Sequence, residues 1–246
     1  MTDSRIKKFS RYKNGDILEI PLLPHLDMFG YAKFIHRSKE NPGYNYVNPF
    51  KWIVFDYFSD SRILNIDKID TATLLCNPLY MFWNLSLSGL DGWKVIGNSK
   101  VLQNEWEAGF VRRLNHLNHA ISIEEYKNIN WSVYLDTESS LEFGHNWQIF
   151  PWKQVNHLER SGSTSLNCLP FRIILEKMKK DHVNFDLTNI SKMEWLIYRQ
   201  CCDIPPYNEI PHEFRQIPIP LEFEVLWKDK SKLYFNYNDY MNKNIE

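Results

Sequence analysis

The sequence predicts an α+β fold: an N-terminal small SH3-like β-barrel or strongly bent antiparallel sheet, followed by a mixed α/β C-terminal half packed against it. Two observations carry this prediction. The first half holds short segments of alternating apolar residues separated by turn residues, which is typical of strands. The second half holds helical spacing of apolar residues at 169–182 and 191–202. We expect two closely packed domains, residues 1–118 and 119–246.

The first two strands are expected on either side of a short loop. Asn14-Gly15-Asp16 has turn chemistry, because Gly and Asn tolerate backbone angles that reverse the chain. The apolar residues of 16–22 then alternate, and Pro21 places the end of this strand near it or at a sheet edge. A second strand is expected over 29–35, and Gly30 between two aromatic residues indicates a bend or a close backbone approach.

The remaining elements are predicted from the same two patterns, the alternation typical of strands and the spacing of three or four residues typical of helices. Strands are expected where β-branched and aromatic residues gather, and helices where apolar residues recur every three or four positions. In the N-terminal half we expect strands at 51–58, 79–87 and 92–98, and helices at 67–75 and 102–117. In the C-terminal half we expect a capped helix at 122–129, strands at 131–135 and 147–152, the helices 169–182 and 191–202, an extended proline-rich segment at 204–220 and a hairpin over 221–237.

Composition narrows the classes of function. The chain has 246 residues, of which 43% are hydrophobic, enough for a substantial core in one large domain or two ordinary ones. Its formal net charge of −1 disfavours a generic nucleic-acid coat, which is usually basic, and also a strongly acidic decoy surface. Aromatic residues make up 15%, which suits β-rich packing and aromatic-lined surfaces.

The cysteines and the apolar runs bear on the compartment. The four cysteines show no CxxC pair, so we expect free thiols in a reducing compartment. The polar, basic N-terminus has no apolar region typical of a secretory signal, and no apolar run reaches membrane-spanning length. The expected protein is soluble and cytoplasmic, without a membrane partner.

Candidate catalytic and metal-binding residues are few. His116 and His119 have a spacing at which two helical histidines can share a metal, but the sequence lacks an HExxH pattern, and polar residues at a helix end are the commoner case. Glu142 and His145 could form an acid–base pair, yet they flank an expected turn and fit a solvated hairpin tip. Nucleophile-elbow, Walker-type and dinucleotide motifs are absent. We therefore assign no catalytic, cofactor-binding or metal-ligating residue and expect a protein that is not an enzyme.

Three short motifs in order resemble a known family. They are Gly15-Asp16-Ile17 leading into Ile20-Pro21-Leu22, then Phe29-Gly30-Tyr31-Ala32-Lys33, then Gly92-Trp93-Lys94-Val95-Ile96-Gly97. Over roughly the first 115 residues the chain resembles the immunity protein 26 family of bacterial toxin–antitoxin-like competition systems. The resemblance implies an immunity protein that neutralises a cognate protein toxin by occluding or distorting its active surface. About half of the chain lies beyond the matching part.

The sequence is compatible with two functions, toxin binding and nucleic-acid binding. Residues that bind a partner are expected in loops. For the toxin-binding function the candidate residues, chosen for polarity and turn content, are His25, Asp27, Arg37, Tyr44, Tyr46, Glu138, Glu142 and His145. The alternative is a nucleic-acid-binding barrel that uses exposed aromatic residues and the basic N-terminus, namely Arg5, Lys7, Lys8, Arg11 and Lys13. An enzyme with an unrecognised site ranks last.

Overall fold

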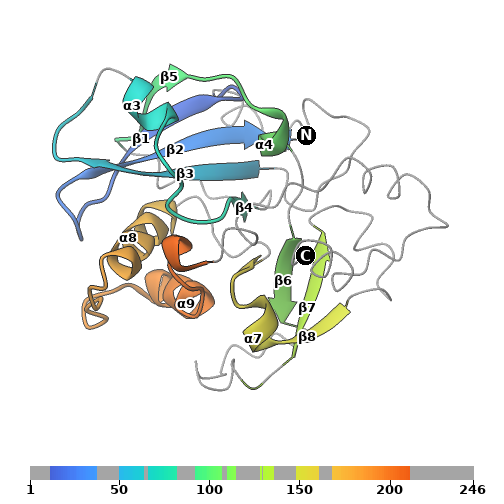
Figure 1. The fold of residues 1–246 in the computed structure, drawn as a ribbon. Helices are drawn as coiled ribbons and strands as arrows, with labels where there is room; N and C mark the ends of the chain where they lie inside the picture. The colour runs from blue at the N-terminus through green and yellow to red at the C-terminus, as the bar shows by residue number, and fades with distance from the viewer. Residues whose placement is uncertain are drawn as a thin grey trace, which may run out of the picture.

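The architecture comprises two sheets with a pair of helices beside them (Figure 1). The computed structural model describes residues 12–37, 50–63, 66–81, 92–106, 110–114, 128, 130–135, 148–160 and 168–210. No helix in these ranges is long and apolar enough to cross a membrane.

The first sheet has five strands in the order β4-β3-β2-β1-β5, and every neighbouring pair is antiparallel. Register shifts at Ile17/Leu18 and at Gly30/Tyr31 mark bulges, which bend strands and increase their twist. Among the described strands β4 and β5 are the two edges and do not pair, so the sheet is open and an SH3-like barrel is not confirmed. The strands are β1 (Asp16–Pro21), β2 (Phe29–His36), β3 (Phe50–Ser59), β4 (Leu79–Met81) and β5 (Lys94–Asn98).

Helix α8 (Leu169–Lys180) completes the core on one face of this sheet. Leu169, Ile173 and Ile174 share a single buried cluster with apolar side chains of β1 to β4. The approach is close at Gly30, where an added Cβ would lie 2.9 Å from Cγ2 of Ile173. This contact explains the glycine between two aromatic residues, and it joins a C-terminal helix to the N-terminal sheet.

The opposite face of the same sheet is also covered. Short helix α3 (Asp67–Asp70) places Ile69 in a second buried cluster with Ile17, Tyr31 and other side chains of that face. Because both faces are packed, β1 and β2 are buried almost throughout, although part of their sequence alternates.

The second sheet has the order β8-β7-β6-β9, with β6 and β9 parallel and the other pairs antiparallel. Helix α8 lies against α9 through a third apolar cluster that includes Phe171 and Ile197. The remaining elements are α4 (Gln103–Trp106), β6 (Phe110–Leu114), β7 (Asn130–Leu135), β8 (Gln148–Pro151), α7 (Trp152–Val155), β9 (Glu159–Arg160), α9 (Lys192–Cys201) and the 3-10 turn η2 (Tyr207–Glu209).

Most sequence-based elements within the described ranges are confirmed, and one is wrong. The expected helix over 102–117 ends at Trp106 in α4, and residues 110–114 form strand β6. Apolar residues at 106, 110 and 114 fit a helix, but 110, 112 and 114 also share one face of a strand, and pairing with β7 and β9 decides the outcome. The expected helix at 67–75 is shortened to α3.

Helix α9 begins with a capping box. The Ser191 hydroxyl accepts from the backbone N–H of Glu194 at 3.2 Å, and the Glu194 carboxylate accepts from the backbone N–H of Ser191 at 2.7 Å. The expected hairpin over 221–237, the turn at 143–147 and most of the helix at 122–129 and of strand 79–87 lie outside the described residues.

Candidate functional site

The loop between β1 and β2 carries two of the predicted partner-binding residues. Nε2 of His25 lies 2.7 Å from a carboxylate oxygen of Glu194 at the start of α9. The His25 ring also packs near Phe171 and Phe185, with centroid distances of 5.5 and 5.6 Å. His25 therefore fastens this loop to the C-terminal helices, while Asp27 is exposed to solvent.

Arg37 follows β2 and is fully buried. Its guanidinium carbon lies 4.8 Å from the centroid of the Tyr80 ring, a cation–π contact. In this conformation its side chain has no surface to offer a partner, because the long stem and charged head are both enclosed. The other predicted residues lie outside the described ranges, namely Tyr44, Tyr46, Glu138, Glu142 and His145, as do His116 and His119.

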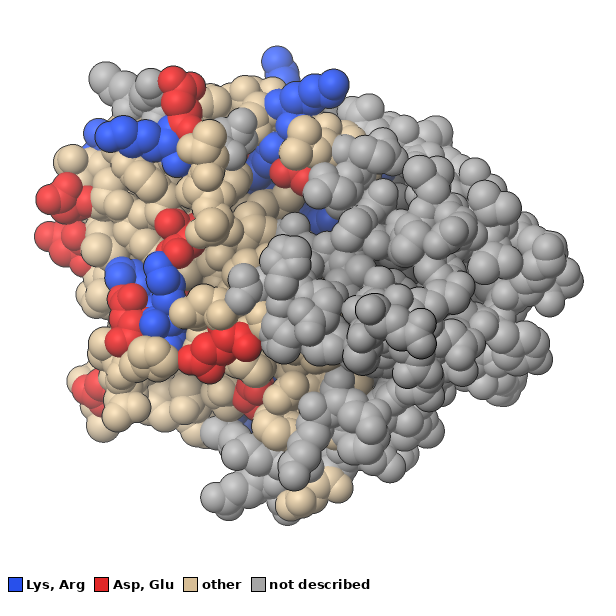
Figure 2. All heavy atoms as spheres, in the orientation of Figure 1, with Lys and Arg blue, Asp and Glu red and all other residues tan. Residues whose placement is uncertain are grey.

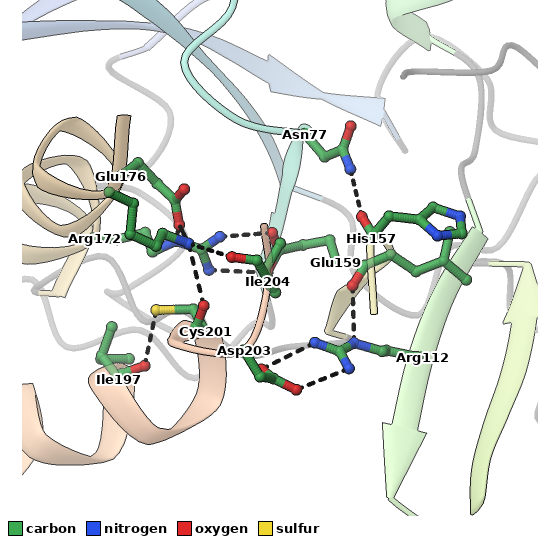
Figure 3. Close-up of polar contacts among 12 residues, drawn as sticks. Asn77, Arg112, His157, Glu159, Arg172, Glu176, Ile197, Cys201, Asp203 and Ile204 are labelled. Carbon is green, nitrogen blue, oxygen red and sulfur yellow. Dashed lines mark hydrogen bonds and ion pairs between the residues drawn. The ribbon is translucent and has the colours of Figure 1, made fainter. Parts of the chain in front are cut away.

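A buried network of charged side chains lies where α8, α9 and the second sheet meet, and sequence reasoning missed it (Figure 3). Arg172 of α8 forms a bidentate pair with Glu159 of β9, at 2.9 and 2.8 Å, and its Nε donates to Glu176 at 2.8 Å. Lys179 contacts the same Glu176 at 2.7 Å and donates to the carbonyl of Cys201 at 3.2 Å. Two carboxylates are thus matched by two cations.

A second buried pair approaches the same β9 region from the other side. The Arg112 guanidinium, from β6, donates to both carboxylate oxygens of Asp203 at 3.0 and 3.1 Å, and to the carbonyl of Leu158 at 2.9 Å. The indole N–H of Trp152 donates to Asp203 at 2.8 Å, and Arg112 lies 4.5 Å from the Trp131 ring centroid. Figure 3 shows Arg172 and Arg112 reaching toward residues 157–159 from opposite sides.

Burial sets the protonation of the neighbouring groups. Desolvation, together with the charge of Arg112, lowers the pKa of His157 to about 4, so this imidazole is neutral at pH 7. Burial likewise raises the pKa of the Cys76 and Cys201 thiols. Burial alone would lower the pKa of Arg172. The negative charge of Glu159, with smaller contributions from other neighbours, outweighs burial and raises the pKa well above its ordinary value.

These contacts give the network a structural role, because they hold α8 against β9 and against the end of α9. The charges are paired, the thiols are protonated, and within the described ranges no group of three His, Cys, Asp or Glu residues is placed to hold a metal. Sequence reasoning placed 169–182 as a helix but did not use the four-residue spacing of Arg172 and Glu176, which was the available signal. Arg112 gave no such signal, because its partner lies 91 residues away.

Surface charge is mixed on the described part of the face in Figure 2. Lys and Arg side chains lie beside Asp and Glu side chains there, without an extended region of one sign. A nucleic-acid groove would be expected to show a basic stripe, which this part of the surface does not.

Comparison with known proteins identifies the N-terminal region. No curated protein and no solved structure matches the chain. A family model does match, and its residues span all five strands of the first sheet, from Asp16 to Asn98. The resemblance seen in the sequence motifs is therefore confirmed for the N-terminal half: residues 13–121 match the family described as immunity protein 26.

Proposed function

We propose that this protein is a bacterial immunity protein that binds a cognate protein toxin and neutralises it by covering the toxin's active surface. The observation that carries the proposal is the family match over residues 13–121, since this family implies an immunity protein against a toxin. Neutralisation by contact needs no catalytic group in the immunity protein. The ion pairs buried among the described residues suit this view, because they join elements of the fold: Arg112 of β6 meets Asp203 after α9, and Arg172 of α8 meets Glu159 of β9.

A stable complex of this kind buries on the order of 1,600 Å² in total, centred on a few aromatic or arginine side chains with a polar rim. Asp27 is a candidate for the rim, because it is exposed in the loop that His25 holds against α9. We keep Tyr44, Tyr46, Glu138, Glu142 and His145 as proposed contacts from the sequence.

We propose that both expected domains, residues 1–118 and 119–246, are needed for this function. Leu169, Ile173 and Ile174 of α8 fill the core on one face of the family-matched sheet, and that face would be exposed without them. The four cysteines are free thiols, which supports the reducing, cytoplasmic compartment that we propose.

Co-expression tests the proposed function. The protein encoded by the gene adjacent to this one is placed under an inducible promoter in a host that lacks both genes. We expect induction to kill cells that carry an empty vector or an unrelated immunity protein, and cells that carry this protein to survive. Death in its presence, with the protein accumulating in soluble form, would remove the proposal.

The same purified protein tests the nucleic-acid alternative. We expect no binding to a fluorescent single-stranded oligonucleotide at low salt. Binding that weakens steeply as salt is raised would favour the alternative instead.

A further inference from the structure

Strand β5 forms one edge of the first sheet. It pairs with β1 alone, and no other described strand lies on its outer side (Figure 1). Lys94, Val95 and Asn98 are exposed, and Val95 keeps 46% of its surface accessible. Alternate residues of an edge strand turn their backbone N–H and C=O groups away from the sheet, where another strand can pair with them.

Lysines without an ion pair gather around this edge. Of the ten lysines whose side chains the structure describes, five are engaged: Lys33, Lys177, Lys179 and Lys180 contact carboxylates, and Lys51 donates to a backbone carbonyl. Five exposed lysines in the described ranges have no such contact, and four of these belong to β5 or to segments beside it: Lys13, Lys68, Lys94 and Lys100. The fifth, Lys192, begins α9.

Backbone and side-chain contacts hold these segments at β5. The Ser99 N–H donates to the Gly15 carbonyl at 2.9 Å, which places residues 13 and 100 at the same end of the strand. The Ile66 side chain packs against Gly97, which brings the start of α3 beside β5. Three carboxylates lie in the same area: Asp67 is exposed on α3, and Asp16 and Glu19 of β1 lie opposite Asn98 and Lys94. Asp16 and Glu19 are buried, and Glu19 is paired with Arg62, so the four lysines leave positive charge in excess at the exposed edge.

Edge lysines disfavour pairing with a second copy of the same edge, because like charges would meet. They favour an extended segment that carries carboxylates at alternate positions, since main-chain bonds would supply affinity and the charges would supply specificity. The edge from Lys94 to Asn98 spans about 13 Å at ~3.3 Å per residue. It also lies within the family-matched residues, whereas the exposed Trp195 of α9 does not.

We propose that the β5 edge binds an extended acidic segment of the toxin as an additional strand. This inference rests on the proposed function and names the surface that performs it.

The experiment uses the full-length, isotope-labelled protein and two probes. The first probe is an eight-residue peptide of alternating Val and Glu with blocked ends, and its control is the matching peptide of Val and Lys. The second probe is the protein encoded by the adjacent gene, followed by hydrogen exchange of the backbone amides. The variant pair is Lys94→Glu with Lys100→Glu, and the matched control is Lys192→Glu.

We expect the Val-Glu peptide to shift the amide resonances of residues 92–100 and the Val-Lys peptide to leave them unchanged. The double variant should bind the acidic peptide about tenfold more weakly, while Lys192→Glu should bind like the wild type. With the adjacent gene's product we expect slower amide exchange at 94–98.

The outcomes separate the two proposals. The edge proposal is overturned if the adjacent gene's product binds the double variant as tightly as the wild type and protects amides away from β5 from exchange. The proposed function would stand in that case. Absence of binding between the adjacent gene's product and the wild-type protein overturns the proposed function and this inference together. Equal binding of both peptides, or of neither, also overturns the edge proposal.

Discussion

The buried pair of Arg112 and Asp203 gives the sharpest test of how this molecule is held together. Both side chains are fully enclosed, and two hydrogen bonds at 3.0 and 3.1 Å join them. Arg112→Met leaves the Asp203 carboxylate with the Trp152 indole N–H but without its cation. Asp203→Leu leaves the Arg112 charge buried without its carboxylate. The double variant removes both charges.

The expected magnitudes follow from burial. Removing one partner of a buried ion pair costs about 3–5 kcal/mol of unfolding free energy, because the remaining charge stays desolvated. Independent effects would therefore sum to about 8 kcal/mol. In the double variant the neutral Leu158 carbonyl and Trp152 N–H each lose one hydrogen bond, at about 1–3 kcal/mol each. We expect the double variant to lose about 4–5 kcal/mol, a coupling of about 3 kcal/mol.

Urea unfolding followed by far-UV circular dichroism measures this cycle. Trimethylamine N-oxide at one fixed concentration in every sample keeps the single variants folded. The control cycle uses Lys177 and Asp181, a partly exposed pair at 2.6 Å at the C-terminal end of α8, for which about 0.3–0.5 kcal/mol of coupling is expected. If the losses of unfolding free energy at Arg112 and Asp203 add to within about 0.5 kcal/mol, the reasoning that charge burial dominates this ion pair is refuted.

Two further predictions concern the contacts between the halves. Gly30→Ala should lower the free energy of unfolding by about 1–3 kcal/mol, because the new Cβ would lie 2.9 Å from Ile173 Cγ2. This loss should be smaller in an Ile173→Ala background. Equal shifts of the urea midpoint in both backgrounds would contradict the close packing. Burial raises the pKa of Glu194, but hydrogen bonds from the Ser191 backbone N–H and from His25 outweigh it and lower the pKa overall. This stability is present above the unfolded pKa of ~4.3 and is lost as pH falls through the lower folded pKa, so Glu194→Gln should lose about 0.3–1 kcal/mol at pH 7 and match the wild type near pH 2. A difference that stays constant in a pH series of urea midpoints would contradict this assignment.

Local chemistry made much of the fold predictable. The turn at Asn14-Gly15-Asp16 is confirmed, and Gly15 has a φ of 87°, a region that favours glycine. The start of α9 follows from Ser191 and Glu194, whose mutual hydrogen bonds depend on residues three apart. The strand at 110–114 was mistaken for a helix because its spacing fits both periods, and its pairing with β7 and β9 depends on segments distant in the sequence.

The sequence by itself determined the central strands, the helices α8 and α9 and the family of the N-terminal half, because apolar period, turn residues and short motifs act within a few positions of the chain. Only the tertiary structure decided which charges are buried and which are left exposed. Arg37 and His25 looked like loop residues available to a partner, yet one is enclosed and the other meets Glu194, 169 residues away. The solvation of a charged side chain depends on what folds around it, and neither its own identity nor its neighbours in the chain reveal that environment.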